Sequence, residues 1–316
     1  METQFRFSPY RRIILFIFGA VVLSTVSAQP SHKANTGNIS RKWLDITYAS
    51  KSPAQKLDIY LPESGDGPFP VILSIHGGAF KSGDKGDNQV VPMLEGVKRG
   101  YAVVSINYRL SGEAIAPAQI NDVKAAVRWI RAKAKQYKFN PAKIAAWGGS
   151  AGGNLAALLG TSGEVKELED LSQGNETQSS RVQAVVDWFG PTDFLKMDQQ
   201  LKEGNVKNPQ THSIPNSPES ELIGKNLVDA PDLVKKANPE TYVTSDDPPF
   251  FIEHGRIDHL VPYQQSVTLA GKLESAIGKA KVILEILPEN DHGGPGFTTP
   301  QNISKVFDFL DKYLKN

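Results

Sequence analysis

One stretch, residues 144–159, constrains the fold of this chain more than any other. Its first four residues are apolar and predict a buried strand, and its last five predict a buried helix. Between them lies Gly-Gly-Ser-Ala-Gly, a G-x-S-x-G sequence centred on Ser150. A strand, a tight turn flanked by glycines and a helix are the context of a nucleophile elbow, in which a strained backbone exposes a serine hydroxyl at the end of a sheet. The N-terminus of the following helix would favour negative charge that develops there.

The rest of the chain alternates strand patterns with helix patterns. Continuous apolar runs at 71–75 and 101–106 predict central strands that are covered on both faces. Apolar residues at three- and four-residue steps in 120–134 predict a helix packed on a sheet. We expect further strands at 44–49, 56–61, 182–188, 249–253 and 282–287, a hairpin connection at 62–68, and further helices at 263–277 and 301–314. This alternation predicts an α/β fold with a mostly parallel sheet, right-handed crossovers and flanking helices.

Residues 1–28 have the features of a secretory signal peptide. A pair of arginines precedes an apolar run at 13–23, and a small-residue cleavage site, Val-Ser-Ala, ends at Ala28. We expect cleavage there and a periplasmic or secreted bacterial protein; an uncleaved membrane anchor is the alternative. The chain has no cysteine, so disulfides and thiol chemistry are excluded.

The 288 residues after the predicted cleavage site are enough for one large α/β domain. We expect a loose lead-in at 29–42 and a single domain at 43–316. Residues 193–240 are polar, rich in Pro and Asn and without sheet periodicity, and predict a cap-like insertion over the strand ends. Without its signal peptide the chain loses three Arg and one Glu, which leaves a net charge of −1. That balance gives no reason to expect binding to nucleic acid or to an anionic membrane.

A serine nucleophile needs a base, and the base needs a carboxylate to orient it. Functional side chains of such a sheet lie in the loops after its strands. Of the six histidines, only His292 both follows the last predicted strand and is flanked by glycines that let its loop fold back toward Ser150. Asp258 follows the preceding strand, and we prefer it to Asp291, because Asp291 adjoins His292 and neighbouring side chains in a turn point apart.

The loop that starts at His76 follows an early central strand and continues with small residues. Its backbone N–H groups, together with the N–H of Ala151, would form an oxyanion hole. We expect His76 to organise this loop and not to act in catalysis. Trp188 and Phe189 leave a central strand and are candidates for lining an acyl or sugar pocket, although core packing explains them equally well.

Six segments together resemble the α/β-hydrolase esterases. They are His76-Gly-Gly-Ala-Phe, Tyr108-Arg-Leu, Gly148-Gly-Ser-Ala-Gly-Gly, Gly190-Pro-Thr-Asp, His254-Gly-x-x-Asp with Val261-Pro, and His292-Gly. The chain is most similar to the bacterial carbohydrate esterases of the bifunctional acetylxylan/feruloyl type, near the hormone-sensitive-lipase and carboxylesterase group, from about residue 43 to 314. The resemblance implies that Gly78 and Ala79 donate to the oxyanion and that Gly77 is a spacer. The hormone-sensitive-lipase pattern has a third glycine at Ala79 and an acidic residue at Gly149, so the chain resembles a side branch.

The predicted activity is hydrolysis of a carboxylic ester, on a small molecule or on acetyl or feruloyl groups of a plant polysaccharide such as xylan. No cluster at metal-ligand spacing occurs, so we expect neither a metal nor a cofactor. A peptidase, amidase or formamidase on the same fold and a non-catalytic binding module are the alternatives. A binding module would be expected to have lost Ser150, Asp258 or His292, and all three residue types are present.

Overall fold

The sheet that the sequence predicts is present in the computed structural model, which describes residues 1–2, 33–163 and 165–316. In these residues eight strands are joined in the order β1-β2-β4-β3-β5-β6-β7-β8. Their bounds are β1 (Lys42–Thr47), β2 (Lys56–Tyr60), β3 (Phe69–Ile75), β4 (Ala102–Ile106), β5 (Phe139–Gly149), β6 (Ala184–Trp188), β7 (Phe250–Gly255) and β8 (Val282–Leu287). Each strand that the sequence predicts has a counterpart within a few residues. Apart from its first two residues, the predicted signal peptide lies outside the described residues.

The sheet is parallel from β4 through β3 to β8, whereas β2 pairs antiparallel with both of its neighbours, β1 and β4. The hairpin predicted at 62–68 is wrong, because β2 pairs with β4 and not with β3. In the sheet β4 lies between β2 and β3, so the connection from β2 to β3 has to pass the end of β4. A turn-rich sequence marks the bend, but it does not say which strand the chain pairs with after the bend.

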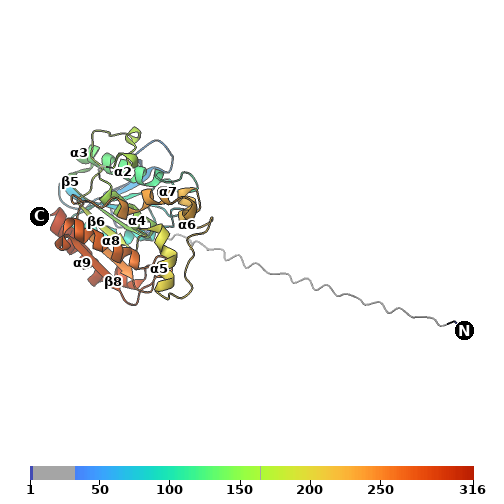
Figure 1. The fold of residues 1–316 in the computed structure, drawn as a ribbon. Helices are drawn as coiled ribbons and strands as arrows, with labels where there is room; N and C mark the ends of the chain where they lie inside the picture. The colour runs from blue at the N-terminus through green and yellow to red at the C-terminus, as the bar shows by residue number, and fades with distance from the viewer. Residues whose placement is uncertain (3–32, 164) are drawn as a thin grey trace. The chain divides into compact units, whose positions relative to one another are not determined.

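Helices cover both faces of the sheet (Figure 1). On one face α2, α4 and α8 contact the central and C-terminal strands, and on the other α1 and α9 contact β3 to β6. The helices are α1 (Val91–Lys98), α2 (Ala118–Ala132), α3 (Ala134–Tyr137), α4 (Ala151–Thr161), α5 (Met197–Glu203), α6 (Pro218–Ile223), α7 (Pro231–Ala237), α8 (Gln264–Ile277) and α9 (Pro300–Leu314). The sequence reasoning predicted α2, α4, α8 and α9 and missed α1. Each face has its own apolar core, and the buried side chains of the parallel strands alternate between the two.

The segment at 193–240 holds no strand in the structure and forms three short helices, α5 to α7, which are labelled on the right-hand side of the folded domain in Figure 1. Its apolar side chains, such as Phe194 and Leu222, are buried in the core on the α4 face. It also reaches loops at the strand ends: Glu221 pairs with Lys81 at 2.6 Å, and His212 Nε2 lies 2.8 Å from the carbonyl oxygen of Leu260.

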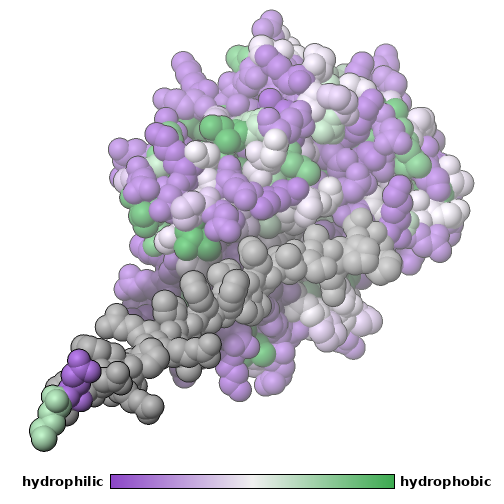
Figure 2. Space-filling view, turned by 90° about the vertical axis from the view of Figure 1, so that its right-hand side faces the viewer, coloured by the Kyte–Doolittle hydropathy of each residue, from purple (hydrophilic) through white to green (hydrophobic). Residues whose placement is uncertain are grey.

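The part of the predicted lead-in that the structure describes, residues 33–42, contacts the domain. The backbones of Lys33 and Asp87 form an isolated antiparallel β-bridge, and the Ala34 N–H donates to the carbonyl of Gly86 at 2.8 Å. On the face shown in Figure 2, hydrophobic residues lie scattered among hydrophilic ones. None of the helices in the described residues has the length and apolar character that a membrane crossing needs.

Candidate active site

Ser150 lies in the turn between β5 and α4, with φ 58° and ψ −124°. A non-glycine residue with positive φ is strained and is held only by its surroundings. The Ser150 N–H donates to the carbonyl oxygen of Trp188 at 2.9 Å. A Cβ on Gly148 would lie 2.2 Å from the carbonyl oxygen of Gly152, and one on Gly152 would lie 2.1 Å from that of Ile75. The two glycines therefore permit the close approach of strand and helix that puts Ser150 at the apex.

The ring of His292 connects Ser150 with Asp258. His292 Nε2 lies 2.8 Å from Ser150 Oγ, and His292 Nδ1 lies 2.7 Å from Asp258 Oδ2. A proton on Nδ1 that is donated to the carboxylate leaves Nε2 as an acceptor for the serine hydroxyl. The side chain of Phe189 packs edge-on against this ring, with centroids 4.8 Å apart. The loops after β5, β7 and β8 thus bring together the three residues that the sequence singled out.

Asp258 is buried and fully hydrogen-bonded. Its Oδ1 accepts from the N–H groups of Leu260 at 2.9 Å and Val261 at 2.8 Å, and its Oδ2 faces His292 and, at 3.2 Å, His254. Burial raises the pKa of Asp258, but the attraction of His292 and the hydrogen bonds from both histidines together hold that pKa well below its usual range. The carboxylate is therefore an anion at every pH at which the domain would work.

Asp291 faces a different histidine. Its Oδ1 lies 2.7 Å from His259 Nδ1 and accepts from the His259 N–H at 3.0 Å. The same oxygen also accepts from the His292 N–H at 2.7 Å. Asp291 therefore holds the backbone of the His292 loop and ties it to the loop after β7. The sequence favours Asp258 over Asp291 as the partner of the His292 ring, but it gives no sign of this second role of Asp291, since backbone contacts leave no pattern in a sequence.

The remaining histidines on the strand ends are satisfied by local partners. His254 Nδ1 lies 2.7 Å from Ser266 Oγ, and His254 Nε2 lies 2.8 Å from the carbonyl oxygen of Val261. His76 stacks on Tyr108 with ring centroids 4.4 Å apart. Burial lowers the pKa of His76, which favours the neutral ring.

The loop after β3 lies beside Ser150. A Cβ on Gly77 would lie 3.2 Å from the Cβ of Ser150, and the Gly77 N–H donates to Gln89 Oε1 at 2.8 Å. Gly78 and Ala79 then adopt positive φ values of 114° and 55°. Within the described part of the chain, no hydrogen-bond acceptor is recorded for the N–H groups of Gly78, Ala79 or Ala151. Those three donors are available to a ligand, whereas the N–H of Gly77 is not.

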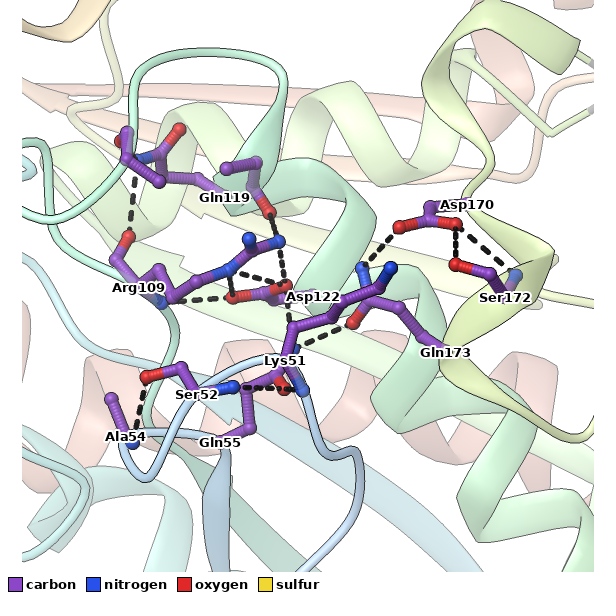
Figure 3. Close-up of polar contacts among 12 residues, drawn as sticks. Lys51, Ser52, Ala54, Gln55, Arg109, Gln119, Asp122, Asp170, Ser172 and Gln173 are labelled. Carbon is purple, nitrogen blue, oxygen red and sulfur yellow. Dashed lines mark hydrogen bonds and ion pairs between the residues drawn. The ribbon is translucent and has the colours of Figure 1, made fainter.

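A polar network joins Arg109 and Gln55 to Asp122 of α2 (Figure 3). Arg109 donates to both carboxylate oxygens of Asp122, at 2.7 and 2.9 Å, and Gln55 Nε2 donates to Asp122 Oδ1 at 2.8 Å. Next to Arg109, the hydroxyl of Tyr108 donates to the carbonyl oxygen of His76 at 3.0 Å. The network holds the backbone of Arg109, whose N–H donates to Asp122 Oδ2 at 2.9 Å, and the adjacent Tyr108 holds the start of the His76 loop. This gives the Tyr108-Arg-Leu segment, noted only as part of a resemblance, a physical role.

A cavity of about 860 Å³ opens beside the serine, on the sheet face covered by α1 and α9. Both Trp188 and Phe189 line it, as do Gly149 and Gly293, which are the neighbours of Ser150 and His292 in the chain. Its lining also includes residues that the sequence did not point to: Val91, Pro92 and Met93 from the start of α1, Phe297 from the turn before α9, and Ile303 from α9. A prediction of α1 would have pointed to the first three, whereas nothing in the sequence shows that Phe297 and Ile303 face this cavity. No group of metal-ligating side chains large enough to hold an ion occurs in residues 33–163 and 165–316.

The chain matches the BD-FAE family over residues 57–273. It is 34% identical over 250 residues to Esterase LipQ of Mycobacterium tuberculosis, which covers 78% of this chain and 56% of that protein. The chain spans little more than half the length of the curated relatives it matches.

Two solved structures are similar over most of this chain. A truncated form of a carbohydrate esterase from gut microbiota is 35% identical with a TM-score of 0.80, over 90% of this chain and all of that one. A bifunctional GH43-CE protein of Bacteroides eggerthii is 38% identical with a TM-score of 0.77, over 86% of this chain and 35% of that one. These likenesses confirm the resemblance inferred from the motifs: the chain has the α/β-hydrolase fold and belongs to the BD-FAE family.

Proposed function

We propose that this protein is a secreted serine esterase that hydrolyses carboxylic esters through an acyl-enzyme. The observation that carries the proposal is the position of the His292 ring, 2.8 Å from Ser150 Oγ and 2.7 Å from Asp258 Oδ2. Three backbone donors without recorded acceptors and a cavity lie beside this ring. A nucleophile, a base, an orienting acid and an oxyanion site are the parts that acyl transfer requires.

In the acylation half of the reaction, Ser150 Oγ attacks the ester carbonyl carbon while His292 Nε2 takes the hydroxyl proton. Asp258 keeps the imidazole in the required tautomer and stabilises the imidazolium that forms. The N–H groups of Gly78, Ala79 and Ala151 donate to the oxygen that becomes negative, and the N-terminus of α4 adds to that field. His292 then gives its proton to the leaving alcohol as the carbon–oxygen bond breaks.

In the second half, a water molecule takes the place of the alcohol. His292 removes a proton from the water as it attacks the acyl carbon, and the proton returns to Ser150 Oγ when the acid leaves. Every proton passes through His292, and no metal or cofactor is needed. Each N–H donor of such an oxyanion hole stabilises the transition state by ~3–4 kcal/mol in enzymes of similar chemistry.

The proposed substrates are acetyl or feruloyl esters on plant polysaccharide such as xylan. The solved structures to which the chain is similar include a carbohydrate esterase and a bifunctional GH43-CE protein, which supports this substrate class. The aromatic side chains of Trp188, Phe189 and Phe297 in the cavity wall suit an aromatic acyl group or a sugar ring. The signal sequence predicted at 1–28 supports action outside the cytoplasm, where such polymers occur.

Ser150→Ala tests the chemistry, with Ser275→Ala on the exposed side of α8 as the matched control. Wild type and control should hydrolyse 4-nitrophenyl acetate and take up a phosphonate on Ser150, and both properties should be lost in Ser150→Ala. Chelation with EDTA should leave the rate unchanged. A panel of acetylated xylan, methyl ferulate, triglyceride and peptide tests the substrate class, and a preference for peptide would contradict the proposal.

The proposed export is tested separately from the chemistry. Mass spectrometry of protein from the extracytoplasmic fraction of the native host should find an N-terminus at or near Gln29. An intact chain that starts at Met1 in the cytosol would contradict export and leave the esterase assignment untouched.

A further inference from the structure

Glu253 is a carboxyl group inside the molecule for which ester hydrolysis provides no role. It lies near the end of β7 and is 0% exposed. The strand register puts it beside Trp188 of β6 on one side and Glu285 of β8 on the other, so all three side chains share the face covered by α9. From α9, the side chains of Asn302 and Lys305 face this carboxyl.

Polar atoms without full hydrogen-bond partners gather around Glu253. In the described residues, neither of its carboxylate oxygens has a partner at hydrogen-bond geometry, and the same holds for the indole N–H groups of Trp188 and Trp147. The two indole rings pack edge to face, with centroids 5.1 Å apart. Buried polar groups are costly when unpaired, and a buried charge without a partner costs much more than a neutral group. The site therefore favours a carboxyl that carries its proton.

The electrostatics of the pocket agree with this geometry. Burial raises the pKa of Glu253 to about 8, and the nearby polar side chains of Asn302 and Trp188 lower it only in part. Of the charged groups that face it, Glu285 raises this pKa and Lys305 lowers it. Glu285 and Lys305 also pair with each other at 3.2 Å, which weakens the field of both at Glu253.

Two chains of contact link Glu253 to the active site. The carbonyl oxygen of Glu253 accepts from the Phe189 N–H at 2.7 Å, and Phe189 packs on the ring of His292. The carbonyl oxygen of Trp188 accepts from the Ser150 N–H, and Trp188 also lines the cavity. On the other side, Asn302 Nδ2 donates to the carbonyl oxygen of Phe297, another cavity residue, at 3.1 Å.

We propose that Glu253 is a positioning residue whose neutral carboxyl holds the Trp188 indole and the Asn302 amide in place and so fixes the cavity wall beside Ser150. When the carboxyl loses its proton, the anion draws in water from the cavity and loosens that wall. This inference rests on the proposed esterase function, because the wall matters through the substrate that lies against it.

Glu253→Gln tests the idea, because an amide keeps the shape and the polar contacts but cannot ionise. The matched control is Glu285→Gln, one strand further along the same face. For 4-nitrophenyl butyrate, kcat/KM of the wild type should fall at least about threefold between about pH 7 and about pH 9, mainly through a rise in KM. Glu253→Gln should remove this fall. Glu285→Gln should keep it and move its midpoint to lower pH, because Glu285 raises the pKa of Glu253.

A second measurement needs no substrate and separates this inference from the proposed function. Tryptophan fluorescence of the wild-type protein should change with a midpoint near pH 8, close to the pKa of about 8 for Glu253. The change should be absent in Glu253→Gln and strongly reduced in Trp188→Phe. A wild type without this transition, or a Glu253→Gln variant that keeps it, overturns the inference. A protein that shows the transition but hydrolyses no ester overturns the proposed function instead.

Discussion

At the scale of single residues, Asp258 and Asp291 each make a different contact with His292. Asp258 binds the ring of His292 through Nδ1, and Asp291 binds its backbone N–H. The first contact sets the tautomer of the ring, and the second sets the path of the loop. A substitution that exchanges an oxygen for an NH₂ group distinguishes them, because a backbone N–H needs only one remaining acceptor.

We expect Asp258→Asn to lower kcat about 10²- to 10⁴-fold, because the amide can donate to Nδ1 and would force the proton onto Nε2. Asp291→Asn should lower kcat less than ~10-fold, since its amide oxygen can still accept from the N–H groups of His259 and His292. The measurement is kcat on 4-nitrophenyl acetate, with circular dichroism to show that both variants fold. If Asp291→Asn is the more damaging change, the roles given to the two residues are reversed.

The sequence was sufficient to choose Asp258 over Asp291 because chain direction limits what an adjacent side chain can reach. It was insufficient for Glu253. A lone acidic residue in an apolar strand shows neither which face it occupies nor which groups from α9 cover it. Both follow from the register of three strands and from the packing of a helix some 50 residues away, which local patterns do not contain.

At the scale of elements, the β5–α4 unit depends on glycines that bring two backbones into contact. Gly148 and Gly152 face backbone carbonyls that cannot move aside. Gly271, in the middle of α8, has no heavy atom within 4 Å of the position of an added Cβ. The same substitution therefore has opposite consequences in the two helices.

Gly152→Ala should destabilise the protein by more than ~3 kcal/mol or prevent its folding, because the new methyl group overlaps the carbonyl of Ile75. Gly271→Ala should stabilise it by about 0.5–1 kcal/mol through helix propensity alone. Urea denaturation followed by circular dichroism measures both. A Gly152→Ala variant as stable as the wild type would show that the elbow is looser than the structure has it.

Elements with a regular period were predictable, and those without one were not. The strands β3 to β8 and the helices α2, α8 and α9 follow apolar patterns that a sequence displays directly. Helix α1 is short, and Gly96 in its interior lowers its helix propensity, whereas Pro92 lies in the first turn, where proline is tolerated. A Cβ on Gly96 would lie 2.9 Å from Ile72 Cδ1, so glycine there lets α1 pack closely on β3. Tertiary packing therefore overrides local propensity at α1, and the cavity wall it forms could not be foreseen.

At the scale of the whole molecule, buried carboxyl groups give stability a dependence on pH. The pKa of Glu253 is raised to about 8 and that of Asp187 to about 6, in both cases chiefly by burial. A raised pKa means that the folded state keeps a proton that the unfolded chain has released. The stabilisation is complete below the unfolded pKa and is lost as pH rises through the folded one. Asp258 acts in the opposite direction, but only in strong acid.

We therefore expect the free energy of unfolding to fall as pH rises from about 5 to about 8.5, with Glu253 contributing on the order of 4 kcal/mol. Glu253→Gln should remove most of that fall, and Glu285→Gln should retain it. Urea denaturation at the two pH values gives the change in the free energy of unfolding for each variant. The contributions of the other titrating groups cancel when the variants are compared with the wild type. Equal slopes in wild type and Glu253→Gln would show that Glu253 ionises in the folded protein as it does in the unfolded chain.

Several residues that line the cavity beside Ser150 come from α1 and α9, two helices that carry none of the residues proposed for bond cleavage. Met93 and Ile303 take no part in the contacts that join Ser150, His292 and Asp258. For the proposed esterase, substrate choice and bond cleavage would then depend on different elements of the domain. A lineage could adapt to new acyl groups by changes in two helices while its hydrolytic apparatus stays under constant selection.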